Sequence, residues 1–172
     1  MLVLATVAFA ADAAPIMGQG GEERAYFSAV ARYFQIPEAE IAILGNWDLP
    51  SDEIPVVLFV ARRAGVSAEA LVALRESGRS WPELGERFGI GARQLHVPLS
   101  DPGSAGALES VYERFRVTPV EEWGSIGLTG ADVVALVNVR VLSQVLGVPP
   151  DDVTRRIQDA ESFVELYGRL IR

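Results

Sequence analysis

Apolar residues recur three and four positions apart along most of this 172-residue chain, which is the spacing of one face of an α-helix. Tyr26, Val30 and Phe34 show this spacing in one of the first segments. The segment 52–64 is almost entirely apolar, so we expect it to form a central helix that is buried on most of its surface. The predicted helices cover residues 22–34, 38–44, 52–64, 68–76, 81–88, 106–116 and 131–146.

Residues that typically begin or end helices support these boundaries. Ser80 and Glu83 have the spacing of a capping box, in which each side chain accepts a hydrogen bond from a free backbone N–H group. Gly65 follows the central segment and can adopt the left-handed conformation that ends a helix. We expect Ser51 or Asp52 to cap the start of the same helix.

The segment 65–90 has a divergent copy at 147–172. One constant offset (147 − 65 = 82) pairs Gly65 with Gly147 and Ser80 with Ser162. Each copy would leave apolar surface that the other copy can bury. We therefore predict an all-α protein in which two internally duplicated multi-helix units pack into one compact domain.

The duplication also divides the chain. Residues 22–91 form the first predicted unit, residues 92–105 the linker, and residues 106–172 the second unit. Ahead of them, residues 1–13 are predicted to be a signal peptide and residues 14–21 a flexible leader, because the latter are rich in glycine and begin near a proline.

The export prediction depends on the first ten residues, MLVLATVAFA, which form an uncharged run as long as the apolar region of a signal peptide. Cleavage near Ala10 or Ala13 would follow a small-x-small pattern and leave a periplasmic or secreted protein. The basic residues that normally precede such a run are missing, so a buried first helix or strand is the alternative. No segment has the length of about 20 apolar residues that spans a bilayer.

One predicted helix has an ambiguous pattern. Apolar and polar residues alternate within 133–141, from Val137 through Asn138, Val139 and Arg140, and such alternation is typical of a strand. The corresponding part of the first unit lacks the alternation, so the duplication favours a helix.

Composition limits the classes of function. The formal charge of −8 argues against general nucleic-acid binding, which needs Lys and Arg to neutralise phosphates. The absence of cysteine excludes disulfides, thiolate metal sites and cysteine nucleophiles. No nucleotide-binding or metalloprotease motif is present. We therefore expect no cofactor, no metal site and no nucleic-acid partner.

A weak local resemblance to helix-turn-helix segments gives the first alternative function. In such a DNA-binding regulator the second helix enters the major groove. Glu83 and Glu86 would then face the phosphates and be repelled by them, so a capped hairpin used for packing is the preferred interpretation. The arginines that this alternative would use are Arg75, Arg79, Arg87 and Arg93.

His96 gives the second alternative, a small hydrolase. It is the only histidine, and it could act as a general base beside Asp101 or Glu109. A half-buried linker residue that makes one hydrogen bond is the preferred interpretation.

Trp47 is the tryptophan that we expect to meet a partner, because it lies in a loop and has no apolar counterpart in the second unit. Asp48 follows it and is a second binding candidate. Helix capping explains the carboxylates that cluster at 48–53, 121–122, 132 and 151–152 without any chemistry.

Asn138 and Arg140 are the last binding candidates, because they are polar residues inside an apolar predicted helix. Buried polar groups need partners, so these two either bond to the backbone of the other unit or line a cavity. Internal pairing is the preferred interpretation.

The segments 55–65 and 137–143 resemble a group of uncharacterised exported proteobacterial proteins, which share a Pro-Val-x-Leu-Phe-x-Ala-Arg-Arg-Ala-Gly core and a Val-Asn-x-Arg-x-Leu-Ser segment. The resemblance implies export and a helical fold and carries no activity. Together with the patterns above, it leads to one hypothesis: a non-catalytic structural or protein-interaction module of the bacterial envelope, whose partner is another envelope protein.

Overall fold

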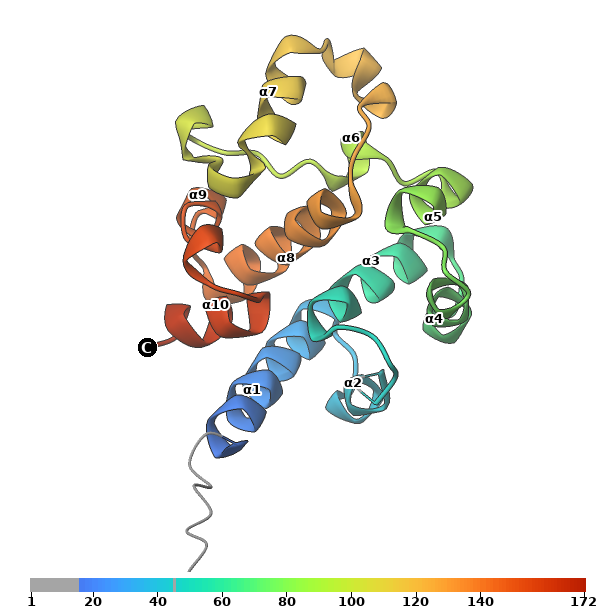
Figure 1. Cartoon of the computed structure of the whole chain (residues 1–172), viewed down its shortest axis with the longest axis vertical. Helices are drawn as coiled ribbons and strands as arrows, with labels where there is room; N and C mark the ends of the chain where they lie inside the picture. The colour runs from blue at the N-terminus through green and yellow to red at the C-terminus, as the bar shows by residue number, and fades with distance from the viewer. Residues whose placement is uncertain (1–15, 45) are drawn as a thin grey trace, which may run out of the picture.

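Helices α3 (Ile54–Ala64) and α8 (Gly130–Leu146) lie side by side at the centre of the structure, and the other helices surround them (Figure 1). The computed structural model describes residues 16–44 and 46–172. Within these ranges the chain is helical and contains no strand, which confirms the predicted all-α class. The fold is compact, and its apolar core draws residues from both halves of the chain.

The remaining α-helices are α1 (Ile16–Phe34), α2 (Glu38–Leu44), α4 (Ala68–Glu76), α5 (Trp81–Phe88), α6 (Ala92–Leu95), α7 (Glu109–Val117), α9 (Pro150–Thr154) and α10 (Phe163–Leu170). Short 3₁₀ helices connect them: η1 (Ser51–Glu53), η2 (Pro102–Ser104), η3 (Gly106–Leu108), η4 (Val120–Ser125) and η5 (Ile157–Asp159). Helix α1 packs against both α8 and α10, so the beginning and the end of the described chain lie together.

The predicted burial of the central helix is confirmed, because every side chain from Ile54 to Ala61 is buried. The ambiguous segment 133–141 is helical throughout. Alternation did not produce a strand there, because α8 is enclosed by its neighbours and its polar residues find internal partners.

Several helix boundaries follow from local sequence as expected. Gly65 and Gly147 both end their helices in the left-handed conformation, each with φ of 67°. Ser80 and Glu83 form the predicted capping box on α5, and Thr129 begins α8 in the same way. The bounds of α2 are those predicted.

Two predictions in this part of the chain need correction. The flexible leader is wrong for residues 16–21, which belong to α1; glycine weakens a helix but does not prevent one. The segment predicted as a linker, 92–105, contains the short helices α6 and η2. Neither Ser51 nor Asp52 caps its own helix, because η1 and α3 begin without a side-chain cap.

The predicted signal peptide, residues 1–13, lies outside the described residues. Among the helices that the structure does describe, none has the length and hydropathy needed to cross a membrane.

Asn138 is fully buried in α8 and joins three parts of the fold. Its Oδ1 atom accepts a hydrogen bond from the Tyr26 hydroxyl of α1. Its Nδ2 atom donates to the Asp52 carbonyl at 2.9 Å and to the Val134 carbonyl at 2.9 Å. The structure therefore gives this candidate an internal bonding role in the core.

Arg140 connects α8 to the end of α6. Its Nη2 atom lies 2.8 Å from the His96 carbonyl oxygen and 3.2 Å from that of Leu95, so it satisfies carbonyls that the end of a short helix leaves free. Its guanidinium also lies over the Phe59 ring, 5.4 Å from the ring centre. Arg140, like Asn138, holds separate segments together.

The Tyr26–Asn138 contact leads to a test by double-mutant cycle. Tyr26→Phe should lower the free energy of unfolding by about 1 kcal/mol, and Asn138→Leu by about 2–3 kcal/mol, because each leaves buried polar groups unpaired. The double variant should show a coupling of about 1 kcal/mol in urea unfolding, because the two changes remove one shared bond. Tyr26→Phe combined with the distant, exposed change Glu69→Gln should be additive; additivity in both pairs would contradict the shared bond.

Candidate functional site

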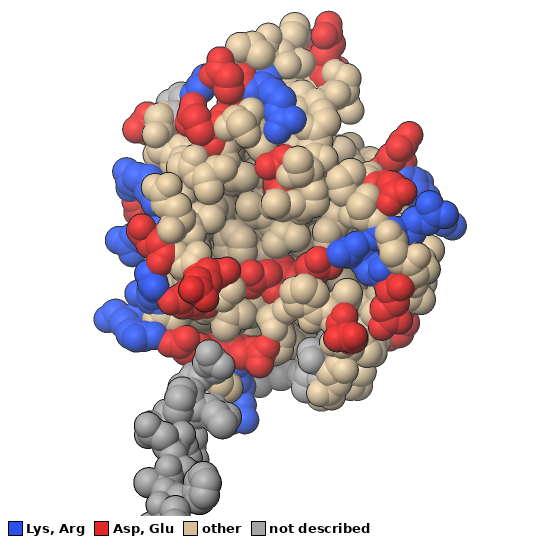
Figure 2. All heavy atoms as spheres, viewed as in Figure 1, with Lys and Arg blue, Asp and Glu red and all other residues tan. Residues whose placement is uncertain are grey.

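Two adjoining cavities form a groove where the two halves of the chain meet. The first, which we name the apolar cavity, has a volume of about 590 Å³; the second, the acidic cavity, has about 690 Å³. Pro50 and Asp52 line both, so the cavities are neighbours that share part of their walls. On the face drawn in Figure 2, uncharged side chains fill the centre, and carboxylates gather below them over α10 and α1.

The walls of the apolar cavity come from both halves of the chain. The first half contributes Glu53, Arg75 and Trp81, from η1, α4 and α5. The second half contributes mainly apolar side chains, which include Leu108, Ala131, Val134, Ala135, Ile157 and Phe163. A concave, mostly apolar cavity with a few polar groups is the usual form of a binding site in proteins.

Trp81 carries an unsatisfied donor beside this cavity. The side chain is buried, and its Nε1 atom has no hydrogen-bond partner among the described residues. Its ring packs against the Arg75 guanidinium, 5.0 Å from the ring centre. Arg75 in turn makes a two-pronged ion pair with Glu53, with Nε–Oε2 and Nη2–Oε1 distances of 3.0 and 2.8 Å. The charges of Arg75 and Glu53 in this wall are therefore paired with each other.

Asp52 lies at the junction of the two cavities. Its carboxylate accepts hydrogen bonds from the backbone N–H groups of Phe163, at 3.0 Å, and Val164, at 3.3 Å. It thus caps α10, which is more than a hundred residues away, instead of its own helix. Burial raises the pKa of this carboxyl, and the two backbone hydrogen bonds oppose that increase.

The start of α10 shows how Asp52 completes a cap that local sequence only half provides. Ser162 accepts a hydrogen bond from the Glu165 N–H at 3.1 Å, which is one half of a capping box. The Glu165 carboxylate accepts from the Glu161 N–H at 2.8 Å instead of from Ser162, so the reciprocal half of the box is absent. The two N–H groups that remain are those bonded to Asp52.

The acidic cavity is lined by five carboxylates, those of Glu22, Glu23, Asp52, Glu161 and Glu165. Two of them are paired: Glu22 with Arg172, and Glu165 with Arg169 at 2.6 Å. Glu23 accepts a hydrogen bond from the Ser51 hydroxyl. Within the described ranges, Glu23, Asp52 and Glu161 have no arginine partner, so this cavity carries an excess of negative charge.

This cluster does not have the arrangement of a metal site. No group of three or more His, Asp or Glu side chains in the described part of the chain is placed to hold a metal ion. The groove therefore offers charge and apolar surface, and we assign no metal or cofactor to it.

None of the five general binding candidates lines either cavity, whereas Arg75, one of the arginines of the DNA-binding alternative, lines the apolar cavity. Trp47 is half-buried and packs against the core, and Asp48 is exposed beside it. Asn138 and Arg140 bond internally, as described above. Trp81 and Phe163 do line the groove; they lie 82 positions apart (163 − 81 = 82), and their sequence pattern indicates only core positions.

His96 lies in a cluster of aromatic rings. Its ring centre is 4.4 Å from that of Trp123 and 4.6 Å from that of Phe115. Burial, and then the charge of Arg140, lower its pKa, so it is neutral at pH 7. The carboxylates that the hydrolase alternative would use bond elsewhere: Asp101 accepts from the Gly103 N–H at 2.9 Å, and Glu109 pairs with Arg116 at 2.6 Å.

The four arginines of the DNA-binding alternative each have an internal contact. Arg75 pairs with Glu53, and Arg79 lies 3.6 Å from Glu83. Arg93 donates to the Val120 carbonyl at 2.6 Å. The Arg87 guanidinium lies 5.6 Å from the centre of the Phe88 ring. This geometry does not provide four free cations for phosphate contacts.

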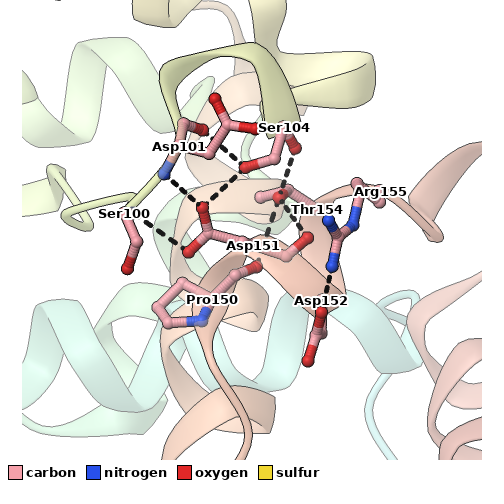
Figure 3. A network of polar contacts seen from close by, with 8 residues as sticks. All are labelled: Ser100, Asp101, Ser104, Pro150, Asp151, Asp152, Thr154 and Arg155. Carbon is pink, nitrogen blue, oxygen red and sulfur yellow. Dashed lines mark hydrogen bonds and ion pairs between the residues drawn. The ribbon is translucent and has the colours of Figure 1, made fainter.

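A separate carboxylate, Asp151 of α9, clamps the loop between the two halves. It is buried and accepts hydrogen bonds from the backbone N–H groups of Ser100 and Asp101, at 3.1 and 2.8 Å, and from the Ser104 hydroxyl at 2.7 Å. Figure 3 shows its carboxylate pointing into this loop, while Thr154 donates to the Ser104 carbonyl. Burial alone would raise the Asp151 pKa, but the hydrogen bonds outweigh it and lower the pKa to about 2.

Comparisons with known proteins add no relative to this picture. No protein-family model matches the chain, and no curated protein or solved structure matches it either.

The cap made by Asp52 can be tested by substitution. Asp52→Ala should lower the free energy of unfolding by about 1–2 kcal/mol, because two N–H groups of α10 lose their acceptor. Asp52→Asn keeps one acceptor oxygen and should cost less than Asp52→Ala. Urea unfolding measures both, with exposed Asp48→Ala as the control, expected to change stability by less than about 0.5 kcal/mol. Equal effects of Asp52→Ala and Asp48→Ala would contradict the cap.

The clamp made by Asp151 should depend on pH. Asp151→Asn should cost about 2 kcal/mol at pH 7, because it removes hydrogen bonds to a charged group. The folded-state pKa of about 2 lies below the usual value of 3.8, so this stabilisation is complete above pH 4 and is lost as the pH falls toward 2. The difference between wild type and variant in urea should therefore shrink between pH 4 and pH 2.

Asp152→Asn is the matched control for the clamp. Asp152 is the next residue, its side chain is more exposed than that of Asp151, and its carboxylate makes an ion pair with Arg155. Asp152→Asn should change stability by less than about 0.5 kcal/mol. A difference for Asp151→Asn that stays constant across this pH range would rule out the carboxylate as its source.

Proposed function

We propose that this protein is an exported, non-catalytic helical module of the bacterial envelope that binds another protein in the groove between its two halves. One observation carries the binding part of the proposal: a cavity of about 590 Å³, walled by both halves, adjoins a second cavity with unpaired carboxylates. Its volume is within the range of about 300–1,000 Å³ that is usual for ligand sites.

We also propose that the two halves, residues 22–91 and 106–172, descend from one duplicated unit. The constant offset of their matching residues supports this. So do the corresponding caps: Gly65 and Gly147 have nearly identical backbone angles, and Ser80 and Ser162 each accept a hydrogen bond from the glutamate three residues later. In this proposal the groove is the space between the copies.

Export is supported by the amino-terminal apolar run and its Ala-x-Ala patterns. A non-catalytic role is supported by the charged groups that line the apolar cavity, because they are a closed Arg–Glu ion pair and the helix-capping carboxylates of Asp52 and Asp132. His96, the residue that a hydrolase would need, lies instead among the aromatic rings of α7 and η4.

Cross-linking in the producing cells tests this function. The chain has no cysteine, so Ala107→Cys places a unique thiol at the groove, where Ala107 is exposed and lines the apolar cavity. We expect a thiol-reactive photo-cross-linker at this position to give one discrete adduct with another protein in the envelope fraction. Mass spectrometry of the adduct and of the native amino terminus identifies the partner and the cleavage site.

Ala73→Cys is the matched control, because Ala73 is exposed on α4 and lines neither cavity. It should give no such adduct. The same adducts from both positions, or none from Ala107→Cys, would overturn the binding proposal. A cytoplasmic protein that retains Met1 would overturn export.

A further inference from the structure

We propose that the occupant of the groove is a basic segment of the partner protein in which one large apolar side chain stands beside several arginines or lysines. This inference rests on the proposed function, since it names the chemistry of the partner for the same groove. The apolar side chain would enter the apolar cavity, and the basic side chains would enter the acidic cavity next to it.

Charge is the first argument. Five carboxylates line the acidic cavity, and two of them are paired with arginines: Glu165 with Arg169 and Glu22 with Arg172. The remaining three, those of Glu23, Asp52 and Glu161, lie on α1, η1 and the segment before α10, so they surround the cavity from different elements. A positively charged occupant is the one that this arrangement attracts.

The second argument is the apolar cavity, which a small cation alone would leave empty. Leu108, Ile157 and Phe163 line it together with Trp81. The Arg75 and Glu53 side chains in its wall already pair with each other. An apolar or aromatic anchor is the kind of side chain that contributes most when it fills such a cavity.

The third argument is the shared wall of the two cavities. They share Pro50 and Asp52 in their walls, so one extended segment that lies across these two residues contacts both cavities. Asp52 is held in place there by two hydrogen bonds to α10, and its carboxylate is therefore fixed before a partner arrives. A segment with an apolar residue beside its cations fits both cavities together.

A peptide-binding experiment tests the inference with the intact protein. The probe is the fluorescein-labelled peptide Phe-Gly-Arg-Gly-Arg-Gly-Arg, acetylated at its amino terminus, and fluorescence anisotropy measures its Kd. We expect the Kd to rise about tenfold or more when Ala replaces Phe, because the apolar anchor is lost. We expect a similar rise in Kd when NaCl is increased from 20 to 300 mM, because salt screens the charges of the peptide and the protein. A peptide with Glu in place of Arg should not bind.

Variants of the protein locate the site. Glu23→Gln combined with Glu161→Gln should weaken binding about tenfold. Glu69→Gln combined with Glu76→Gln removes the same charge from exposed positions on α4, away from the acidic cavity, and should leave the Kd within about twofold. Ala135→Leu, which partly fills the apolar cavity, should weaken binding of the Phe peptide and not of the Ala peptide. Circular dichroism and the Tm establish that each variant is folded.

The outcomes are distinct. Equal losses in the two pairs of Glu→Gln changes, or equal Kd values for the Phe and Ala peptides, would show unspecific charge attraction and overturn the inference. Absence of binding to any probe peptide would overturn it as well. If any of these outcomes occurs while Ala107→Cys still gives a discrete partner adduct, the proposed function stands and only the basic segment is excluded.

Discussion

The fold depends on enclosing two central helices that have almost no polar face. Helix α3 is buried along its first eight residues, and α8 is buried over most of its middle part, so neither is stable in contact with water. Enclosure in turn leaves polar groups of α8 to be bonded inside the protein, and among the described residues only the Nε atom of Arg140 on this helix is buried without a partner. Asn138 obtains its partners from α1 and η1, and Arg140 from the end of α6. The surrounding helices are therefore positioned by hydrogen bonds as well as by apolar contacts.

Two carboxylates extend this principle to segments that are distant in sequence. Asp52 caps α10, and Asp151 holds the loop that contains Ser100 and Ser104. Each accepts hydrogen bonds from backbone N–H groups. Asp52 joins the first half of the chain to α10 in the second half, and Asp151 joins the connection between the halves to α9 in the second half. The groove lies between elements fixed in this way. Its shape is thus set by the fold itself, which is what a binding site with little reorganisation needs.

Local sequence was sufficient for the features that depend on residues three or four positions apart. The capping box of Ser80 and Glu83 and the helix end at Gly65 are examples, because both partners lie within one turn. It was insufficient for Asp52 and Asp151, whose partners are brought near by tertiary packing. The groove was missed for a related reason: Trp81 and Phe163 have the pattern of core residues, and only the packing of the two halves leaves a cavity beside them. His96 was correctly expected to be half-buried, but its aromatic neighbours come from a later helix.

The position of Asp52 links two properties that are usually separate. The same carboxylate lines both cavities and caps the last helix of the chain. A cation beside it would favour its ionised form, which burial disfavours, and would thereby strengthen the cap. By thermodynamic linkage, whatever stabilises the cap also improves the affinity for the cation. Helix α10 would then become more ordered when the groove is filled, so the end of the chain would report on its occupancy.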